Sequence, residues 1–107
     1  MIDWNRLEVL RAEVGGDAFG EVVALFLEET DGEVARLRGA SPGRGAAASL
    51  HFLRGAALNL GLAELARLCD EGERRLRTGG GFDLAALLAS YDRAREALIA
   101  ALPPVAG

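Results

Sequence analysis

The sequence predicts an all-α domain, and three observations support this prediction. Apolar side chains recur every three to four residues along each long segment, whereas no segment of useful length alternates like a half-buried strand. Ala, Leu, Arg and Glu, which favour helices, are abundant. Glycines and prolines divide the chain into segments of helical length. We therefore expect an antiparallel up-down four-helix bundle with a short additional N-terminal helix, forming one domain over residues 1–107.

An aspartate precedes each of the first two predicted helices. Asp3 is the expected N-cap of a short first helix, which Gly15 and Gly16 should end. Asp17 is the expected N-cap of a longer second helix over about residues 18–38. The residues expected to face the core are Trp4, Leu7, Leu10 and Val14 in the first helix and Phe19, Val22, Val23, Phe26, Thr30, Val34 and Leu37 in the second.

The third and fourth predicted helices form a hairpin around Gly61. Ser41 supplies an N-cap and Pro42 a proline at the first helical position, so the third helix is expected over about residues 43–60. The fourth helix is expected over about residues 62–78. The residues expected to face the core are Ala46, Leu50, Leu53, Ala57 and Leu60 in the third helix and Leu62, Leu65, Leu68, Cys69, Gly72 and Leu76 in the fourth.

A fifth helix follows a flexible turn that we expect at the glycines 79–81. It is expected from Asp83 to about Leu102, where two prolines end it and leave a frayed tail over residues 103–107. The residues expected to face the core are Leu84, Leu87, Leu88, Tyr91, Ala94, Leu98 and Ala101.

Composition and charge argue against several kinds of site. Twelve basic and sixteen acidic residues give a net charge of −4, so neither nucleic acid nor a membrane surface is an expected partner. The single cysteine, Cys69, and the single histidine, His51, can form neither an intrachain disulfide nor a His/Cys zinc site. Charged residues near the start argue against a secretory signal, and no apolar stretch is long enough to span a bilayer, so a cytoplasmic location is expected.

The one histidine occupies an unusual place on its helix. At about 100° per residue, His51 lies about 140° from the centre of the apolar stripe and is expected to face solvent. Gly55, one turn along the same face, costs about 1 kcal/mol relative to alanine and is expected to leave the ring accessible. Arg54 lies toward the same side and brings a positive charge for an anion. Together they suit a transient phosphoryl acceptor, because neutral imidazole is a good nucleophile. The alternatives are close helix packing at Gly55 and an ordinary surface histidine.

Residues 51–61, HFLRGAALNLG, resemble the signature of histidine-containing phosphotransfer (HPt) domains, which reads His-x-Leu-Lys-Gly-Ser followed shortly by Leu-Gly. The matching positions are His51, Leu53, Gly55, Leu60 and Gly61. Arg54 replaces the usual lysine and Ala56 the usual serine. Residues 65–73, LARLCDEGE, resemble the family's Leu-x-x-x-Cys-x-x-Leu-Glu stretch, with Gly72 in place of leucine. The segment FGEVVALFLEE is similar to the family's second helix, so the likeness is expected to cover essentially the whole chain.

The resemblance implies a carrier whose exposed His51 takes a phosphoryl group from one receiver-domain aspartate and gives it to another. Arg54 would balance the phosphoryl charge, and Gly55 would keep the approach open. The implied partners are response-regulator receiver domains and a hybrid sensor histidine kinase, and the carrier itself is expected to be a monomer. No intrinsic cofactor is implied, because Mg²⁺ is expected on the partner receiver domain.

Two other functions stay open. One is the phosphoacceptor domain of a chemotaxis-type histidine kinase, which an ATP-binding domain on another chain phosphorylates. The other is a helical adaptor that is never phosphorylated. The sequence contains no G-x-x-x-x-G-K-[ST] loop, so autonomous kinase activity is not expected.

The predicted hairpin suggests supporting residues for His51. Because His51 lies about 15 Å before Gly61, its neighbours on the fourth helix are expected at residues 71–73. In HPt domains a Gln or Glu at this spacing accepts a hydrogen bond from the imidazole Nδ1, which implies this role for Glu73. Arg77, one turn further, would add positive charge near the phosphoryl group. The alternative for both is a solvated ion pair between them.

Surface features around His51 suggest how a partner docks. Phe52 and Leu58, each about 120° from the core stripe, are candidates for an apolar docking patch unless the first helix covers them. Basic residues of the fourth helix are expected to give His51 a locally basic face, away from an acidic second helix. The basic residues are Arg74, Arg75 and Arg77, and the acidic ones are Glu28, Glu29, Asp31 and Glu33.

Overall fold

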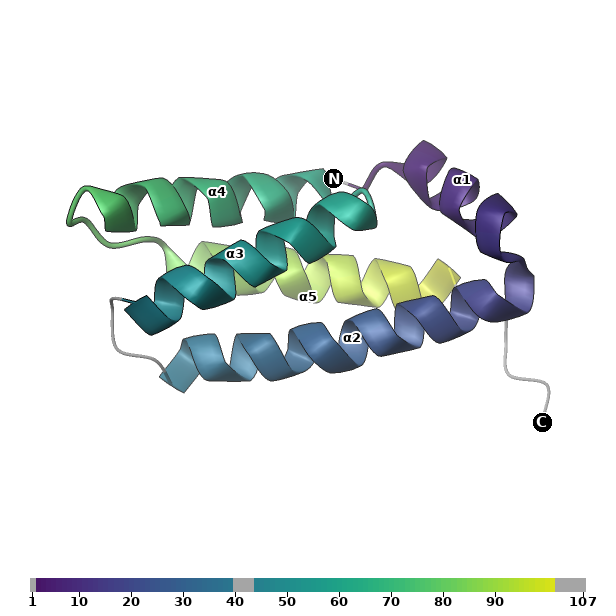
Figure 1. The fold of residues 1–107 in the computed structure, drawn as a ribbon, viewed down its shortest axis with the longest axis horizontal. Coiled ribbons are helices and arrows are strands. Elements are labelled where there is room, and N and C mark those ends of the chain that lie inside the picture. Colours follow the sequence, from purple (N-terminus) through teal and green to yellow (C-terminus); the bar gives the residue numbers. More distant parts are fainter. Residues whose placement is uncertain (1, 40–43, 102–107) are drawn as a thin grey trace.

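A computed structural model describes residues 2–39 and 44–101, and within these ranges the chain forms five α-helices (Figure 1). Their bounds are α1 Trp4–Val14, α2 Gly16–Gly39, α3 Arg44–Asn59, α4 Ala63–Arg77 and α5 Leu84–Ala101. The described residues contain no strand, and the single isolated β-bridge joins Ile2 to Leu62. The all-α prediction is therefore confirmed.

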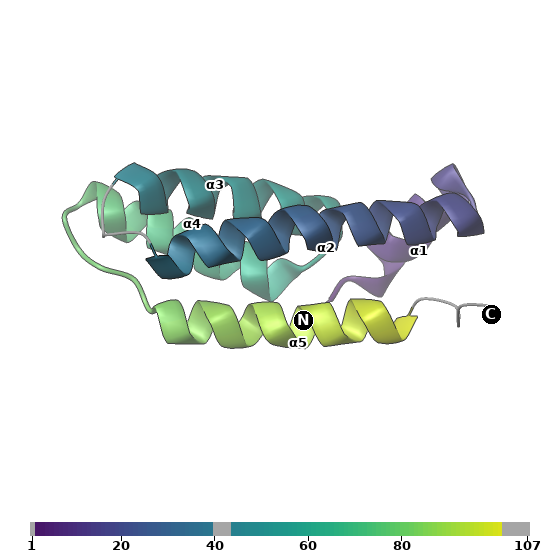
Figure 2. The ribbon, with the colours of Figure 1, turned by 90° about the horizontal axis from the view of Figure 1, so that it is seen from below.

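The four long helices form the bundle. Helices α2, α3, α4 and α5 follow one another in an antiparallel arrangement, and α1 lies at the end of the bundle where α3 turns into α4 (Figure 1). Helix α3 packs against α2 and α4, and α5 packs against both α4 and α2. Figure 2 shows α5 running along one side of the other three long helices. The arrangement is the predicted four-helix bundle with an additional N-terminal helix.

The core lies between the long helices and includes most of the predicted apolar stripes. Residues with almost no exposed surface include Val23, Leu50, Leu53, Leu65, Cys69, Leu87 and Leu98. The prediction was wrong for Trp4, Val14 and Ala101, which are exposed. Helix α1 packs against α2 and the α3–α4 turn through one row of side chains centred on Leu7, and Ala101 is the last residue of α5. The buried residues Leu27, Ser49 and Ala66 were not predicted.

The N-cap prediction is confirmed for α1 and wrong for α2. The Asp3 carboxylate accepts a backbone N–H of the first turn of α1 at 3.1 Å. Helix α2 begins at Gly16, so Asp17 lies inside its first turn. Gly15 is the single residue between α1 and α2, and its φ of +86° makes the turn between them. Its carbonyl accepts the Phe19 N–H at 2.8 Å. Asp17 still interacts favourably with the positive end of the helix dipole.

Gly61 makes the sharp turn between α3 and α4. Its φ is +71°, and a Cβ at this position would lie 2.9 Å from the Asp3 carbonyl oxygen, so only glycine fits. The Gly61 carbonyl accepts the Asp3 N–H at 2.6 Å, and Arg6 Nε donates to the Asn59 carbonyl at 3.1 Å. These bonds anchor the start of α1 on the α3–α4 turn.

Polar side chains join α2 to α5. The Tyr91 hydroxyl donates to the Asp31 carboxylate and lies 2.8 Å from the Thr30 hydroxyl. Arg95 donates to both Asp31 oxygens at distances of 3.1 to 3.3 Å. The Arg95 hydrogen bonds hold the pKa of Asp31 below its ordinary value, and burial raises the pKa of Tyr91.

The remaining helix ends agree with the sequence to within a few residues. Asp83 precedes α5 rather than starting it, and its carboxylate accepts the Ala86 N–H at 2.9 Å as an N-cap does. The predicted Ser41–Pro42 cap and the tail over residues 103–107 lie outside the described residues. Among the helices of the described ranges, none is long and apolar enough to cross a membrane.

Candidate functional site

His51 lies on the solvent side of α3, where its side chain is 67% exposed. Its Nδ1 lies 3.0 Å from Glu73 Oε1. Because an ionised carboxylate only accepts hydrogen bonds, Nδ1 carries the proton and donates it. In the neutral ring the lone pair is then on Nε2, for which the described residues provide no hydrogen-bond partner. The arrangement presents a nucleophilic nitrogen to solvent.

A buried carboxylate on α4 holds the imidazole. Glu73 is only 8% exposed, and the α3–α4 hairpin places it opposite His51, within the predicted residues 71–73. Its second oxygen, Oε2, lies 3.2 Å from Arg54 Nε. The alternative of a solvated ion pair between Glu73 and Arg77 is wrong, because Glu73 is buried and its partners are on α3.

Arg54 is shared between two acids of α4. In addition to Glu73, the guanidinium contacts Asp70, with Nη1 3.6 Å from Oδ1. Arg54 Nε is enclosed and makes no well-directed hydrogen bond, although Glu73 Oε2 is close. The sequence predicted that Arg54 faces a bound anion, and its acidic partners on α4 were not predicted. The hairpin explains the pairing, because Arg54 lies one turn nearer to Gly61 than His51 does.

Two glycines have opposite surroundings beside the site. A Cβ built on Gly55 would meet nothing within 4 Å, so close helix packing is not the reason for this glycine. A Cβ built on Gly72 would lie 3.0 Å from Leu50 Cδ1 and 3.4 Å from Phe82, so Gly72 lets α4 approach α3 closely. Gly55 leaves open space along the His51 face, whereas Gly72 brings the two helices together behind it.

The apolar residues predicted for docking are on the surface. Phe52 is 41% exposed and Leu58 is 59% exposed, so α1 does not cover them. A groove of about 330 Å³ lies nearby between α1, α2 and the second half of α3. Its lining includes Ala56, one helical turn from Phe52, and the exposed Leu25 of α2. Exposed apolar side chains therefore lie both beside His51 and along this groove, whose lining also includes Arg6, Glu29 and Asn59.

The arginines of α4 differ from the prediction. Arg77 is exposed at the last position of α4, one turn beyond Glu73, and the described residues show no ion pair between it and Glu73. The ion pairs of the other two arginines are Arg74–Asp70 at 3.2 Å and Arg75–Glu71 at 2.8 Å. The expectation that Arg74 and Arg75 give His51 a basic face was wrong, because Asp70 and Glu71, one turn earlier on α4, neutralise their charges.

Asp70 is a charged residue of this cluster that was not predicted from the sequence. Its side chain is 41% exposed, and its two oxygens contact Arg54 and Arg74 separately. The geometry of the α3–α4 hairpin could have predicted the contact between Asp70 and Arg54. The count that places residues 71–73 opposite His51 also places the preceding turn of α4 opposite Arg54.

Cys69 lies in the core behind the site and has no exposed surface. Burial, followed by the nearby Glu73 carboxylate, raises the pKa of its thiol to about 12. The thiol is therefore protonated at neutral pH and contributes packing. Within residues 2–39 and 44–101, no group of three or more His, Cys, Asp or Glu side chains is placed to hold a metal ion.

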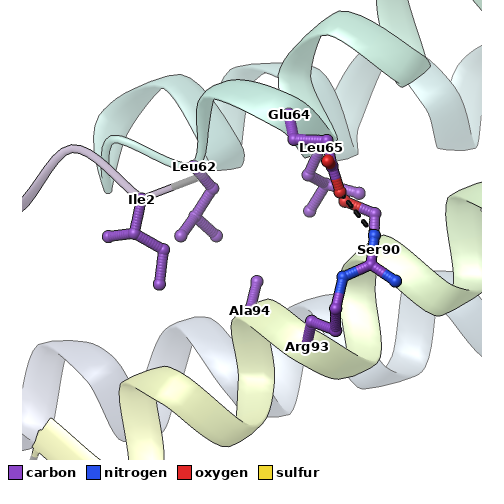
Figure 3. A pocket seen from close by; sticks show the side chains of 7 residues that line it. All are labelled: Ile2, Leu62, Glu64, Leu65, Ser90, Arg93 and Ala94. Atoms are coloured by element: carbon purple, nitrogen blue, oxygen red, sulfur yellow. Dashed lines mark hydrogen bonds and ion pairs between the residues drawn. The ribbon is translucent and has the colours of Figure 1, made fainter.

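A separate hollow of about 210 Å³ lies between Ile2, the start of α4 and the middle of α5 (Figure 3). On one side of it, Arg93 Nη2 donates to Glu64 Oε1 at 2.7 Å. The hollow shares no lining residue with the His51 site.

Comparison with known proteins identifies the family. The family model of the Hpt domain matches residues 21–102, a range that begins inside α2 and includes α3, α4 and α5. The resemblance was expected to cover essentially the whole chain, but α1 lies outside this match. No curated protein and no solved structure matched the chain.

Hpt domains are helical bundles that take part in histidine phosphotransfer in phosphorelay signalling. They are phosphotransfer carriers rather than kinases, and they interact with receiver domains and kinases. The match covers most of this chain, and the chain therefore belongs to the Hpt domain family.

Proposed function

We propose that this chain is a phosphorelay intermediate that accepts a phosphoryl group on His51 from the aspartyl phosphate of one receiver domain and passes it to another. The observation that carries this proposal is the hydrogen bond of 3.0 Å between His51 Nδ1 and the buried Glu73, which leaves Nε2 as the exposed lone-pair nitrogen. The proposed unit is a single domain over residues 1–107, acting as a monomer. A cytoplasmic location stays a prediction.

The proposed step is a displacement at phosphorus. The lone pair of Nε2 forms the new N–P bond, and the P–O bond to the receiver aspartate breaks with its electron pair leaving on the carboxylate. The proton stays on Nδ1, and Glu73 stabilises the positive charge that the ring acquires. Delivery to the next receiver is the reverse of this step. The receiver domain supplies the Mg²⁺ and most of the transition-state stabilisation, so the carrier requires no kinase activity and no cofactor of its own.

Three neighbours of His51 have proposed supporting roles. Gly55 leaves the approach to Nε2 open, and the Gly55→Leu variant should therefore transfer slowly. Transfer by that variant at the native rate would contradict this role. Arg54 supplies N–H donors for the phosphoryl oxygens, with the planar fork of a guanidinium in place of the usual ammonium. Arg77 adds positive charge from the other side of His51 along the helix axis.

The exposed apolar residues beside His51 are proposed to dock the receiver domain. Leu58 lies two turns from His51 on the same face of α3. Phe52 lies one turn before Ala56, which lines the groove between α1, α2 and α3. An apolar helix face of the partner, laid over this surface, would bring an aspartate near Nε2. Charged substitutions at Phe52 or Leu58 should weaken transfer at low receiver concentration, and excess receiver should restore it.

Three assays with the native chain and the His51→Gln variant separate the candidate functions. A panel of phosphorylated receiver domains should transfer an acid-labile, base-stable label to the native chain alone. Label that comes only from an ATP-binding kinase domain would favour the phosphoacceptor domain of a chemotaxis-type kinase. Absence of label from every receiver and kinase would favour an unphosphorylated adaptor. Equal labelling of His51→Gln would place the phosphoryl group elsewhere and contradict the proposal.

A further inference from the structure

Charged side chains form a continuous line across α3 and α4. His51 contacts Glu73 at 3.0 Å, Glu73 contacts Arg54 at 3.2 Å, and Arg54 contacts Asp70 at 3.6 Å. Asp70 also contacts Arg74 Nε at 3.2 Å with its other oxygen. Arg54 is therefore the link between Asp70 and the imidazole.

The charges along this line balance before phosphorylation. Arg54 and Arg74 carry two positive charges, and Asp70 and Glu73 carry two negative ones. A phosphoryl group on Nε2 would add up to about two negative charges beside this cluster. Of the two cations, Arg54 lies on the same helix as His51 and contacts the same carboxylate, Glu73. It is therefore the cation best placed to neutralise the added phosphoryl charge.

The guanidinium cannot serve all three anions equally. Its N–H donors form a rigid planar fork, so turning toward a phosphoryl group on Nε2 moves Nη1 relative to Asp70. Its Nε is enclosed without a well-directed hydrogen bond to Glu73, so that contact alone does not fix the orientation of the fork. Asp70 is the second anchor, and its side chain is 41% exposed and able to lose this partner to water.

We infer that Asp70 is a positioning residue that competes with the phosphoryl group for Arg54, and thereby weakens the hold of this chain on that group. The inference rests on the proposed phosphorylation of His51. A carrier must release what it accepts, and an acid that withdraws part of the Arg54 charge favours release. Asp70 takes no part in bond making, because it acts through Arg54.

Phosphoramidate is a suitable probe because it needs no receiver domain. The Nε2 lone pair forms the N–P bond, the P–N bond of the donor breaks, and its electron pair leaves with ammonia. At a fixed ratio of phosphoramidate to ammonium, phosphorus NMR and intact mass give the ratio of phosphorylated to unphosphorylated chain. Asp70→Asn should raise this ratio about two- to fivefold, as expected for a solvent-screened ion pair. Asp70→Glu should restore the native ratio.

Matched variants separate positioning from general effects of charge and folding. Glu71→Gln removes the same charge one residue away, from a side chain whose ion pairs among the described residues are with Arg67 and Arg75, and should leave the ratio unchanged. In an Arg54→Gln background, Asp70→Asn should have no effect beyond that of Glu71→Gln, because the competition is then absent. Thermal unfolding of each variant checks the fold.

The possible results are distinguishable. A native ratio in Asp70→Asn would overturn the inference while leaving the proposed function intact. An equal increase in Glu71→Gln, or an undiminished increase in the Arg54→Gln background, would also overturn it. If the native chain takes no phosphoryl group on His51, the inference and the proposed function are both wrong.

Discussion

Replacing Glu73 by alanine removes the group that holds the proton on His51 Nδ1. A hydrogen bond to a charged acceptor contributes about 1.5–3 kcal/mol. The His51 side chain is 67% exposed, so screening by water reduces the contribution of the hydrogen bond between His51 and Glu73 to about 1 kcal/mol. That amount corresponds to a change of about fivefold in the ratio of the two imidazole tautomers. Arg54 Nε, enclosed and 3.2 Å from the same carboxylate, loses its main charge partner, so the unfolding free energy should also fall by about 1–3 kcal/mol.

Nitrogen NMR of the labelled imidazole measures the tautomer ratio directly. Glu73→Ala should move the population toward the form protonated on Nε2 and slow phosphotransfer by about tenfold. Glu73→Gln keeps an acceptor for the Nδ1 proton but loses the charge, so it should retain the tautomer and transfer at an intermediate rate. Glu71→Ala, which removes a half-buried carboxylate of the same helix that pairs with Arg67 and Arg75, is the matched control. An unchanged tautomer ratio in Glu73→Ala would refute the reasoning.

Four further predictions concern stability and reactivity. Gly55→Ala should raise the unfolding free energy by about 0.5–1 kcal/mol, because helix propensity improves and the added Cβ meets nothing. Gly72→Leu should lower it by about 1–3 kcal/mol, because the space behind it is filled. Chemical denaturation tests each against the native chain: a midpoint that does not rise in Gly55→Ala, or does not fall in Gly72→Leu, would contradict the corresponding prediction. Hydrogen bonds from Arg95 hold the pKa of Asp31 below 3.8, so the stability that this pair contributes is present above that pH and is lost as pH falls through the lowered pKa. Asp31→Asn should therefore flatten the acid limb of a plot of stability against pH, and an unchanged limb would argue against the ion pair. The thiol of Cys69, whose pKa is about 12, should react with iodoacetamide only as fast as the chain unfolds, whereas rapid reaction of the folded chain would show that it is accessible.

The fold was predictable because local patterns and packing agree. Each long helix has an apolar stripe wide enough to identify it, and Gly61 stands where only glycine fits the turn. The contact between His51 and Glu73 was predictable for the same reason. Two regular helices joined by a tight turn have a fixed register, so counting residues from Gly61 places residues 71–73 opposite His51, and the resemblance to HPt domains then singled out Glu73.

Features that depend on tertiary contacts were less predictable. The exposure of Trp4 follows from how α1 rests on the α3–α4 turn, which helical periodicity does not specify. Aspartate is a favoured N-cap residue, which is why Asp17 was expected to cap α2. The positive φ of Gly15 instead lets α2 begin at Gly16, one residue before Asp17. The Arg54–Asp70 pair required the hairpin count to be applied to Arg54 as well as to His51.

The chemical identity of the phosphorylated nitrogen tests the central claim most directly. The native chain would be phosphorylated by a receiver domain, and phosphorus and nitrogen NMR would identify the ring atom that carries the phosphoryl group. We predict one phosphohistidine, at Nε2 of His51, with the proton still on Nδ1 beside Glu73. Phosphorylation at Nδ1 would contradict the assigned role of Glu73, and a chain that takes no phosphoryl group at His51 would contradict the proposed function.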